Sequence, residues 1–386
     1  MGVYTEYLDR KLTFQDLTKE RKAQLKRISD LRGGCDVLVF AADLAKANAP
    51  ISITYPDILP ITDQLANLKG DKLDLILETP GGYGEVAEDI IDLLRAKYET
   101  LGVIVPGWAK SAGTIMVMAA DEILMGPTSA LGPIDAQLSW QGKSFSADAL
   151  LEGFEKIKKE VQDTGILNKA YIPILQGISP GELQTARNAL DFSQILVKNW
   201  LCKFKFKNWT THSKTGLPVT PTEREARAGE IAKKLSAHQD WLTHGRSIKI
   251  ADLEAMGLRI TDYSKSPDLG DALTRYHTLL QMTFATNIYK IFETPESQIL
   301  RFTLQAGVPL PQPARESDAA ILDFQCGNCK ASSRIQANLE KSQPIQPGSH
   351  PFPSDNKFRC PHCGAENDLS EARRQIEAQA KKPVVT

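Results

Sequence analysis

Residues 72–82 read KLDLILETPGG, and residues 101–126 read LGVIVPGWAKSAGTIMVMAADEILMG. Each stretch opens with a short apolar run, passes through a glycine-containing turn and leads into a helical pattern of apolar residues. A further apolar run, at 35–44, precedes a helical pattern at 58–68. Strands that alternate with helices predict an α/β fold with a parallel sheet. Because these strands are apolar throughout, we expect helices to cover both faces of the sheet.

The two turns carry the candidate chemistry. Gly81 and Gly82 lie at a strand end before a helix, where bare N–H groups can bind an anion such as a reaction oxyanion. Ser111 follows the next strand and opens the next helix, which resembles a nucleophile elbow, and the Ala112 N–H could complete an oxyanion hole with that of Gly82. Each turn also has an ordinary interpretation, a plain strand-to-helix turn for the glycines and a helix N-cap for the serine.

The run TPGG…GWAKSAGTIMVMAADEILMGPTSALGPIDAQL resembles the serine dehydratase proteinase family, relatives of signal peptide peptidase A in the ClpP/crotonase superfamily. The resemblance spans about residues 35–260 and is dense at 72–138, with a second patch from His244 to Leu258. It implies a ClpP/crotonase-like stacked ββα spiral, a Ser111 nucleophile, oxyanion donors at Gly82 and Ala112, and homo-oligomers. A peptide or protein substrate would extend beside Gly81 and Tyr83.

The base that activates Ser111 is open from sequence alone. ClpP uses a histidine soon after the serine, but no histidine of this chain precedes His212, and Asp135 stands at the corresponding spacing. Signal peptide peptidase A pairs its serine with a lysine, and the resemblance favours Lys169. A lysine serves as a base when burial lowers its pKa. The alternatives are Lys156, Lys158, Lys159, His238 and His244.

Four cysteines form two CxxC pairs, and this arrangement predicts a structural zinc ribbon with a closed ligand shell. The ligands are Cys326, Cys329, Cys360 and Cys363. The ribbon is expected to dock a protein partner or its own chain. Cys35 and Cys202 stand apart in apolar surroundings and are expected to be inert thiols.

The expected organisation has six parts. These are an N-terminal amphipathic helix (1–34), a ClpP/SppA-like peptidase domain (35–265), a helical extension (266–306), a linker (307–321), the Cys₄ zinc ribbon (322–368) and a tail (369–386).

Charge and hydropathy narrow the function further. The chain has 46 basic and 47 acidic residues, and this balance does not favour binding to nucleic acid or anionic membranes. It has no apolar run long enough to span a membrane and no signal-peptide core, so we expect a cytoplasmic protein.

These features together predict a serine peptidase that forms an acyl-enzyme on Ser111. Two alternatives remain, a crotonase-like acyl-CoA enzyme that uses the same two N–H groups, and a non-catalytic scaffold that presents the ribbon. No phosphate-binding GxxxxGK[ST] loop occurs, so any ATP-driven unfolding would come from another protein.

Overall fold

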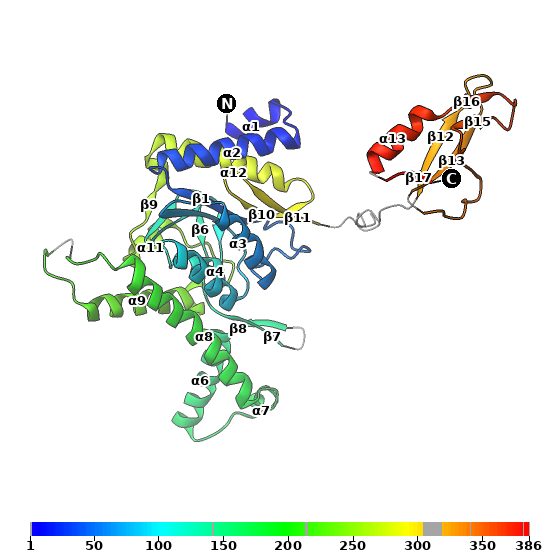
Figure 1. Ribbon diagram of the computed structural model, residues 1–386. Coiled ribbons are helices and arrows are strands. Elements are labelled where there is room, and N and C mark those ends of the chain that lie inside the picture. Colours follow the sequence, from blue (N-terminus) through cyan, green and yellow to red (C-terminus); the bar gives the residue numbers. More distant parts are fainter. Residues whose placement is uncertain are drawn as a thin grey trace. The chain divides into compact units, whose positions relative to one another are not determined.

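The computed structural model describes residues 2–140, 143–212, 215–303, 319–339, 341–380 and 382–385. The chain divides into two compact units, Met1–Thr303 and Leu304–Thr386, which are drawn in Figure 1. Among the described residues, no helix has the length and apolar character needed to cross a membrane.

A seven-stranded sheet organises the first unit, in the order β11-β10-β1-β2-β3-β5-β9. Five of these strands run parallel, and they are β1 (Asp36–Ala42), β2 (Lys72–Glu78), β3 (Thr100–Val105), β5 (Glu122–Met125) and β9 (Thr261–Asp262). Nearly every residue of β1, β2 and β3 is buried. The predicted α/β class with a doubly covered sheet is therefore confirmed.

Alternate residues of β1 belong to two separate apolar clusters, one on each face of the sheet. Leu38 and Phe40 pack with α3 (Ile58–Ala66), α4 (Gly84–Lys97) and α5 (Ala112–Val117). Val37 and Val39 pack with α2 (Phe14–Leu31) and α12 (Pro267–Phe284) on the opposite face. Helix α1 (Val3–Asp9) lies beside α12 (Figure 1). The N-terminal helices are thus part of the core layer, since they cover one face of the sheet.

The segment after α12 differs from the helical extension expected at 266–306. Helix α12 ends at Phe284, and β10 (Ile288–Glu293) and β11 (Gln298–Phe302) then join the sheet as antiparallel strands. This segment forms a strand because it pairs with a distant one: β10 lies along the edge of β1 that β2 does not occupy. The ring of Phe292 also stacks on that of Phe40, with the ring centroids 5.2 Å apart. A local apolar pattern does not reveal such a distant partner.

A helical arm, which lies between β5 and β9 in the sequence, projects from the first unit (Figure 1). It comprises α6 (Ala147–Thr164), η2 (Lys169–Tyr171), α7 (Ile172–Gln176) and α8 (Pro180–Trp200). Its small core is formed by Ala147, Leu151, Ala186 and Leu190. Helix α8 continues into a π-helix, η3 (Leu201–Lys205), which leads back to the body of the unit.

The remaining elements of the first unit are shorter. They are η1 (Tyr55–Asp57), β4 (Trp108–Ala109), β6 (Ala130–Leu131), the β7–β8 hairpin (Gln137–Trp140 and Lys143–Ser146), α9 (Pro221–Ser236), α10 (His238–Trp241), α11 (Ile250–Ala255) and η4 (Tyr263–Lys265).

The second unit is a small β module. Its elements are β12 (Ala319–Gln325), β13 (Ser332–Leu339), β14 (Ser349–Pro351), β15 (Lys357–Arg359), β16 (Glu366–Asp368), α13 (Ser370–Ala380) and β17 (Val384–Val385). The linker expected at 307–321 lies mostly outside the described residues, and its last three residues belong to β12. The tail expected at 369–386 is packed against the module where it is described, because β17 pairs with β13 and Leu369 is buried in the module's core.

Candidate active site

Ser111 stands in a strained backbone conformation between β4 and α5. Its φ of 51° and ψ of −119° lie where residues with a side chain rarely fall, and such strain gathers at active sites. Its side chain makes no capping hydrogen bond, so the N-cap interpretation is not met. The strand–turn–helix placement and the positive φ are those of a nucleophile elbow.

The Gly81–Gly82 turn packs directly against this serine. A Cβ added to Gly81 would lie 2.6 Å from the Cβ of Ser111 and 2.8 Å from the Lys110 carbonyl. Both glycines have positive φ, 100° and 152°. Only glycine therefore lets the turn and the elbow approach this closely.

Two backbone N–H groups near Ser111 have no acceptor in the part of the chain that the structure describes. Ile53 pairs with the glycine turn as in a parallel β-bridge. Its N–H donates to Gly81 O at 2.7 Å, and its carbonyl accepts from Tyr83 N at 3.1 Å. Gly82 N–H takes no part in this pairing and has no described partner. Ala112, as the first residue of α5, has no acceptor within its helix. Donors of this kind are what an oxyanion requires.

An aromatic pair lies beside the same turn. Tyr83 follows Gly82, and its ring is 6.4 Å from that of Tyr55. Both side chains are more than half exposed, at 55% and 56%. They offer an apolar surface next to the candidate nucleophile.

Lys110 anchors the elbow from the other side. Its ammonium group donates to Leu131 O at 3.0 Å, Arg246 O at 3.1 Å and Ser247 Oγ at 3.1 Å. Burial, together with the charge of Lys249, lowers the pKa of Lys110 to about 8. Its three acceptors direct the amine away from Ser111, so we assign it a positioning role.

Asp135 is fully buried and binds two histidines that the sequence places more than a hundred positions later. His238 Nδ1 lies 2.9 Å from one carboxylate oxygen and His244 Nδ1 lies 2.7 Å from the other. Burial by itself raises the pKa of Asp135, but the hydrogen bonds from His244 and His238 outweigh it, and the pKa lies below its usual range. A carboxylate in contact with Nδ1 leaves Nε2 of each ring free to accept a proton.

Two contacts join residues near Ser111 in the sequence to residues near this cluster in the sequence. Thr114, one turn into α5, has its hydroxyl 2.9 Å from Gly132 O and accepts from Gly132 N. Asp135 follows three residues later, and Arg246, which accepts from Lys110, follows His244 by two. Sequence reasoning gave Asp135 no role, although its spacing from Ser111 was the available signal.

The lysine candidates lie on the arm. Lys169 begins η2 and is exposed, as is Lys159. Lys156 pairs with Glu152, and Lys158 pairs with Glu155. No contact joins any of these lysines to Ser111 among the described residues of the chain. The burial expected of a general-base lysine is therefore not met at Lys169.

The four predicted cysteine ligands come together in the second unit. Their sulfur atoms all lie within 4.8 Å of one another, with Cys326–Cys363 and Cys329–Cys360 both at 3.7 Å. A tetrahedral site with Zn–S bonds of 2.3 Å needs sulfur atoms about 3.8 Å apart. The four thiols thus fit a metal ion with no open position, which is the structural rather than the catalytic arrangement.

The other two cysteines lie apart from this cluster. Burial, with the nearby Asp74 carboxylate, raises the pKa of Cys35 to about 12, and burial also raises that of Cys202. Both thiols are therefore poor nucleophiles, as expected.

The segment that contains Ser111 matches the model of a known protein family. Residues 58–174 match the family model described as "ClpP-like SDH-type serine proteinase". This confirms the resemblance that the motifs between 72 and 138 indicated.

Two curated relatives come from Methanocaldococcus jannaschii. "Uncharacterized protein MJ0137" is 44% identical over 209 residues, which cover 54% of this chain and 60% of the relative. "Uncharacterized protein MJ1495" is 28% identical over 188 residues, which cover 49% and 51% respectively. The chain thus spans little more than half the length of these relatives.

Two solved structures are similar to part of this chain. ClpP1 from Listeria monocytogenes is 20% identical, over 33% of this chain and 72% of that one, with a TM-score of 0.22. A mutant of the 1510-N membrane-bound stomatin-specific protease, in complex with a substrate peptide, is 24% identical over 30% and 57%, also with a TM-score of 0.22.

Proposed function

We propose that this chain hydrolyses peptide bonds through an acyl-enzyme on Ser111. Its residues 58–174, which contain Ser111, match the model of the ClpP-like SDH-type serine proteinase family. The observation that carries this proposal is the strained backbone of Ser111, with φ of 51°, held against the Gly81 turn. Neither an N-cap nor a plain turn requires such strain, whereas a nucleophile presented at a strand end does.

The chemistry follows from the groups around the elbow. Ser111 Oγ attacks the carbonyl carbon of the substrate, and the N–H groups of Gly82 and Ala112 bind the resulting oxyanion. The substrate extends beside Gly81 and Tyr83. Loss of one such oxyanion donor typically slows acyl transfer by about 10²–10³-fold.

For the base we propose an imidazole on Asp135, either His244 or His238. The buried carboxylate fixes Nδ1 of both rings as donors, so that Nε2 can take the proton of the Ser111 hydroxyl and later give it to the leaving amine. Lys169 is the competing assignment. It requires an assembly in which the arm of one copy covers Ser111 of another, since Lys169 is exposed in the single chain.

A fluorophosphonate probe, with the labelled residue mapped by mass spectrometry, tests the nucleophile and the base together. We expect Ser111 to be labelled in the zinc-loaded protein and Ser111→Ala to abolish the signal. Removing the base should slow labelling by about 10²-fold or more. The base variants are His244→Ala, His238→Ala and Lys169→Ala, and Lys156→Ala, another exposed lysine of the arm, is the matched control.

The outcomes separate the alternatives. Slow labelling in Lys169→Ala alone would replace the imidazole by the lysine. No labelling of Ser111 in folded, assembled protein would overturn the peptidase proposal and favour a scaffold that presents its second unit to partners.

For the cysteine cluster we propose structural zinc, since four thiolates close the tetrahedral shell. The module would dock a protein partner or its own chain. We also propose a homo-oligomer, in which the exposed apolar side chains of the arm, Ile166 and Ile174 among them, are covered by another copy.

A further inference from the structure

A cavity lies at the end of the sheet opposite to Ser111. Its volume is about 1140 Å³. Thr100, which begins β3, and Asp121, which stands directly before β5, line it at the amino ends of the strands. Ser111 instead follows the carboxyl end of β3 through β4. The cavity is therefore separate from the candidate active site.

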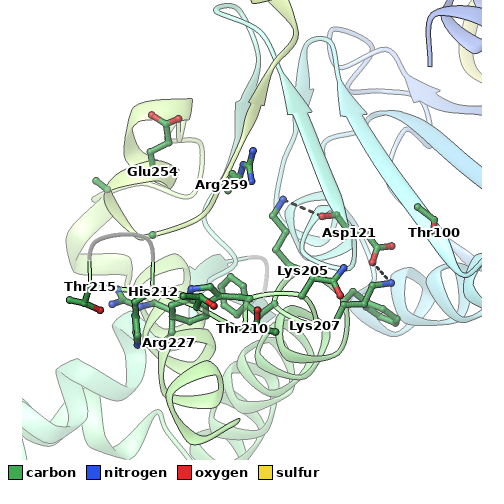
Figure 2. Close-up of a pocket in the computed structure, with 17 residues that line it drawn as sticks. Thr100, Asp121, Lys205, Lys207, Thr210, His212, Thr215, Arg227, Glu254 and Arg259 are labelled. Carbon is green, nitrogen blue, oxygen red and sulfur yellow. Dashed lines mark hydrogen bonds and ion pairs between the residues drawn. The ribbon is translucent and has the colours of Figure 1, made fainter. Parts of the chain in front are cut away.

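The π-helix η3 and the irregular segment after it build one wall of the cavity. They place Lys205, Lys207 and Trp209 along it, and Arg227 and Arg259 approach from α9 and from the segment after α11 (Figure 2). π-Helical turns are found frequently at functional sites. The wall thus brings together cations from three separate parts of the chain.

Among the acidic residues of the lining that the structure describes, only Asp121 pairs with one of these cations, Lys207. Asp121 is already compensated, because its carboxylate pairs with Arg95 at 2.8 Å and with Lys207 at 2.8 Å. Glu254 is drawn with its carboxylate pointing away from Lys205 and Arg259 (Figure 2).

In the described part of the chain, neither Lys205 nor Arg259 forms an ion pair with an acidic side chain. The amine of Lys205 donates only to the Asp121 carbonyl, at 3.3 Å, and Arg259 has no hydrogen-bond or ion-pair partner in the described ranges. Burial lowers the pKa of Lys205 to about 8, and the charge of Arg259 lowers it further, whereas the nearby carboxylates of Glu122 and Asp121 act in the opposite direction. Two cations held together repel one another, so an anion placed between them would gain from both.

The same wall offers a planar surface. The Trp209 ring lies 5.6 Å from that of Phe206 and 5.4 Å from that of His212, and it is only partly buried. Binding sites for small molecules commonly combine aromatic side chains with a few placed polar groups in about 300–1,000 Å³. The cavity is therefore large enough for more than an isolated inorganic ion.

We propose that this cavity binds a small phosphate-bearing ligand with a planar ring, whose phosphate contacts Lys205 and Arg259 and whose ring packs on Trp209. The site is independent of the peptidase proposal. It is expected to bind its ligand equally well in Ser111→Ala.

Calorimetric titration with AMP, pyrophosphate and adenosine tests the proposal in low-salt buffer. We expect saturable binding of AMP and pyrophosphate and none of adenosine. Each of Lys205→Gln and Arg259→Gln should weaken both phosphate probes about tenfold or more, because each removes a charge-assisted contact. Trp209→Ala should weaken AMP but leave pyrophosphate unchanged.

The matched control is Lys203→Gln, which removes an exposed lysine of the same π-helix that does not line the cavity. If this control weakens binding equally, the probes are attracted only by surface charge, and the proposed site is wrong. The proposal is also overturned if neither phosphate probe binds saturably. If Lys205→Gln does not fold, Arg259→Gln alone decides, since Arg259 is exposed and unpaired in the described residues.

Discussion

Replacing Gly81 with alanine tests the close approach of the glycine turn to the nucleophile. The new Cβ would lie 2.6 Å from the Ser111 Cβ, where an ordinary contact needs about an ångström more. Overpacking of this kind costs about 1–3 kcal/mol, and a side chain at positive φ costs about 1–2 kcal/mol more. We therefore expect Gly81→Ala to lose about 2–5 kcal/mol of unfolding free energy and to displace Ser111.

Two other glycines of the same unit provide graded controls. Gly165 has φ of 69° but nothing within 4 Å of an added Cβ, so Gly165→Ala should cost only the backbone term, about 1–2 kcal/mol. Gly153, inside α6, is free of contacts and has no positive φ, so Gly153→Ala should stabilise by about 0.4–1 kcal/mol.

Urea unfolding and the rate of fluorophosphonate labelling measure the two effects. Since a displacement of about 1 Å can cost about 10²-fold in rate, labelling of Gly81→Ala should fall by that order while both controls label normally. If Gly81→Ala unfolds like Gly165→Ala and labels at the wild-type rate, the turn does not touch the elbow in solution, and the account of the site fails.

Three further predictions concern other parts of the chain. Arg21→Met should lower the unfolding free energy by about 3–5 kcal/mol in urea melts, because it removes the cation that pairs with the buried carboxylate of Glu293. Glu293 Oε2 lies 3.1 Å from Arg21 Nε. A loss under 1 kcal/mol, as for an exposed pair, would contradict this prediction. Cys360→Ser should abolish bound zinc, as metal analysis would show, whereas His362→Ala, an exposed neighbour, should retain it. Pyrophosphate affinity should fall as pH rises through about 8, because the Lys205 amine is protonated below its pKa of about 8 and neutral above it; an equally steep fall in Lys205→Gln would assign the effect to another group.

The elements around Ser111 could be predicted from sequence because their determinants are local. The apolar strands, the glycine turn and the serine at a helix start stand next to one another, and so do the paired cysteines. Each short motif carries its own geometry. The two CxxC pairs predicted the cysteine cluster, and the family resemblance pointed to Ser111, in both cases without long-range information.

The features that sequence reasoning missed depend on distant contacts. The Asp135 cluster joins residues more than a hundred positions apart. The residues next to His238 and His244 in the sequence do not indicate that either histidine contacts a buried carboxylate. Strand β10 looked helical because its partner β1 lies some 250 residues earlier, as in the pairing of Val39 with Glu293. Lys169 was favoured by resemblance, but burial is a tertiary property, and the arm leaves that lysine exposed.

The late strands also set an order for biosynthesis. Until β10 emerges from the ribosome, one edge of β1 has no neighbour, and a bare edge invites pairing with other chains. Domains generally fold as units during synthesis, and contacts of such high sequence separation form slowly. Some 175 residues are therefore synthesised between Ser111 and the strands that complete the sheet. Chains that end before residue 288 are expected to aggregate rather than to hydrolyse peptides.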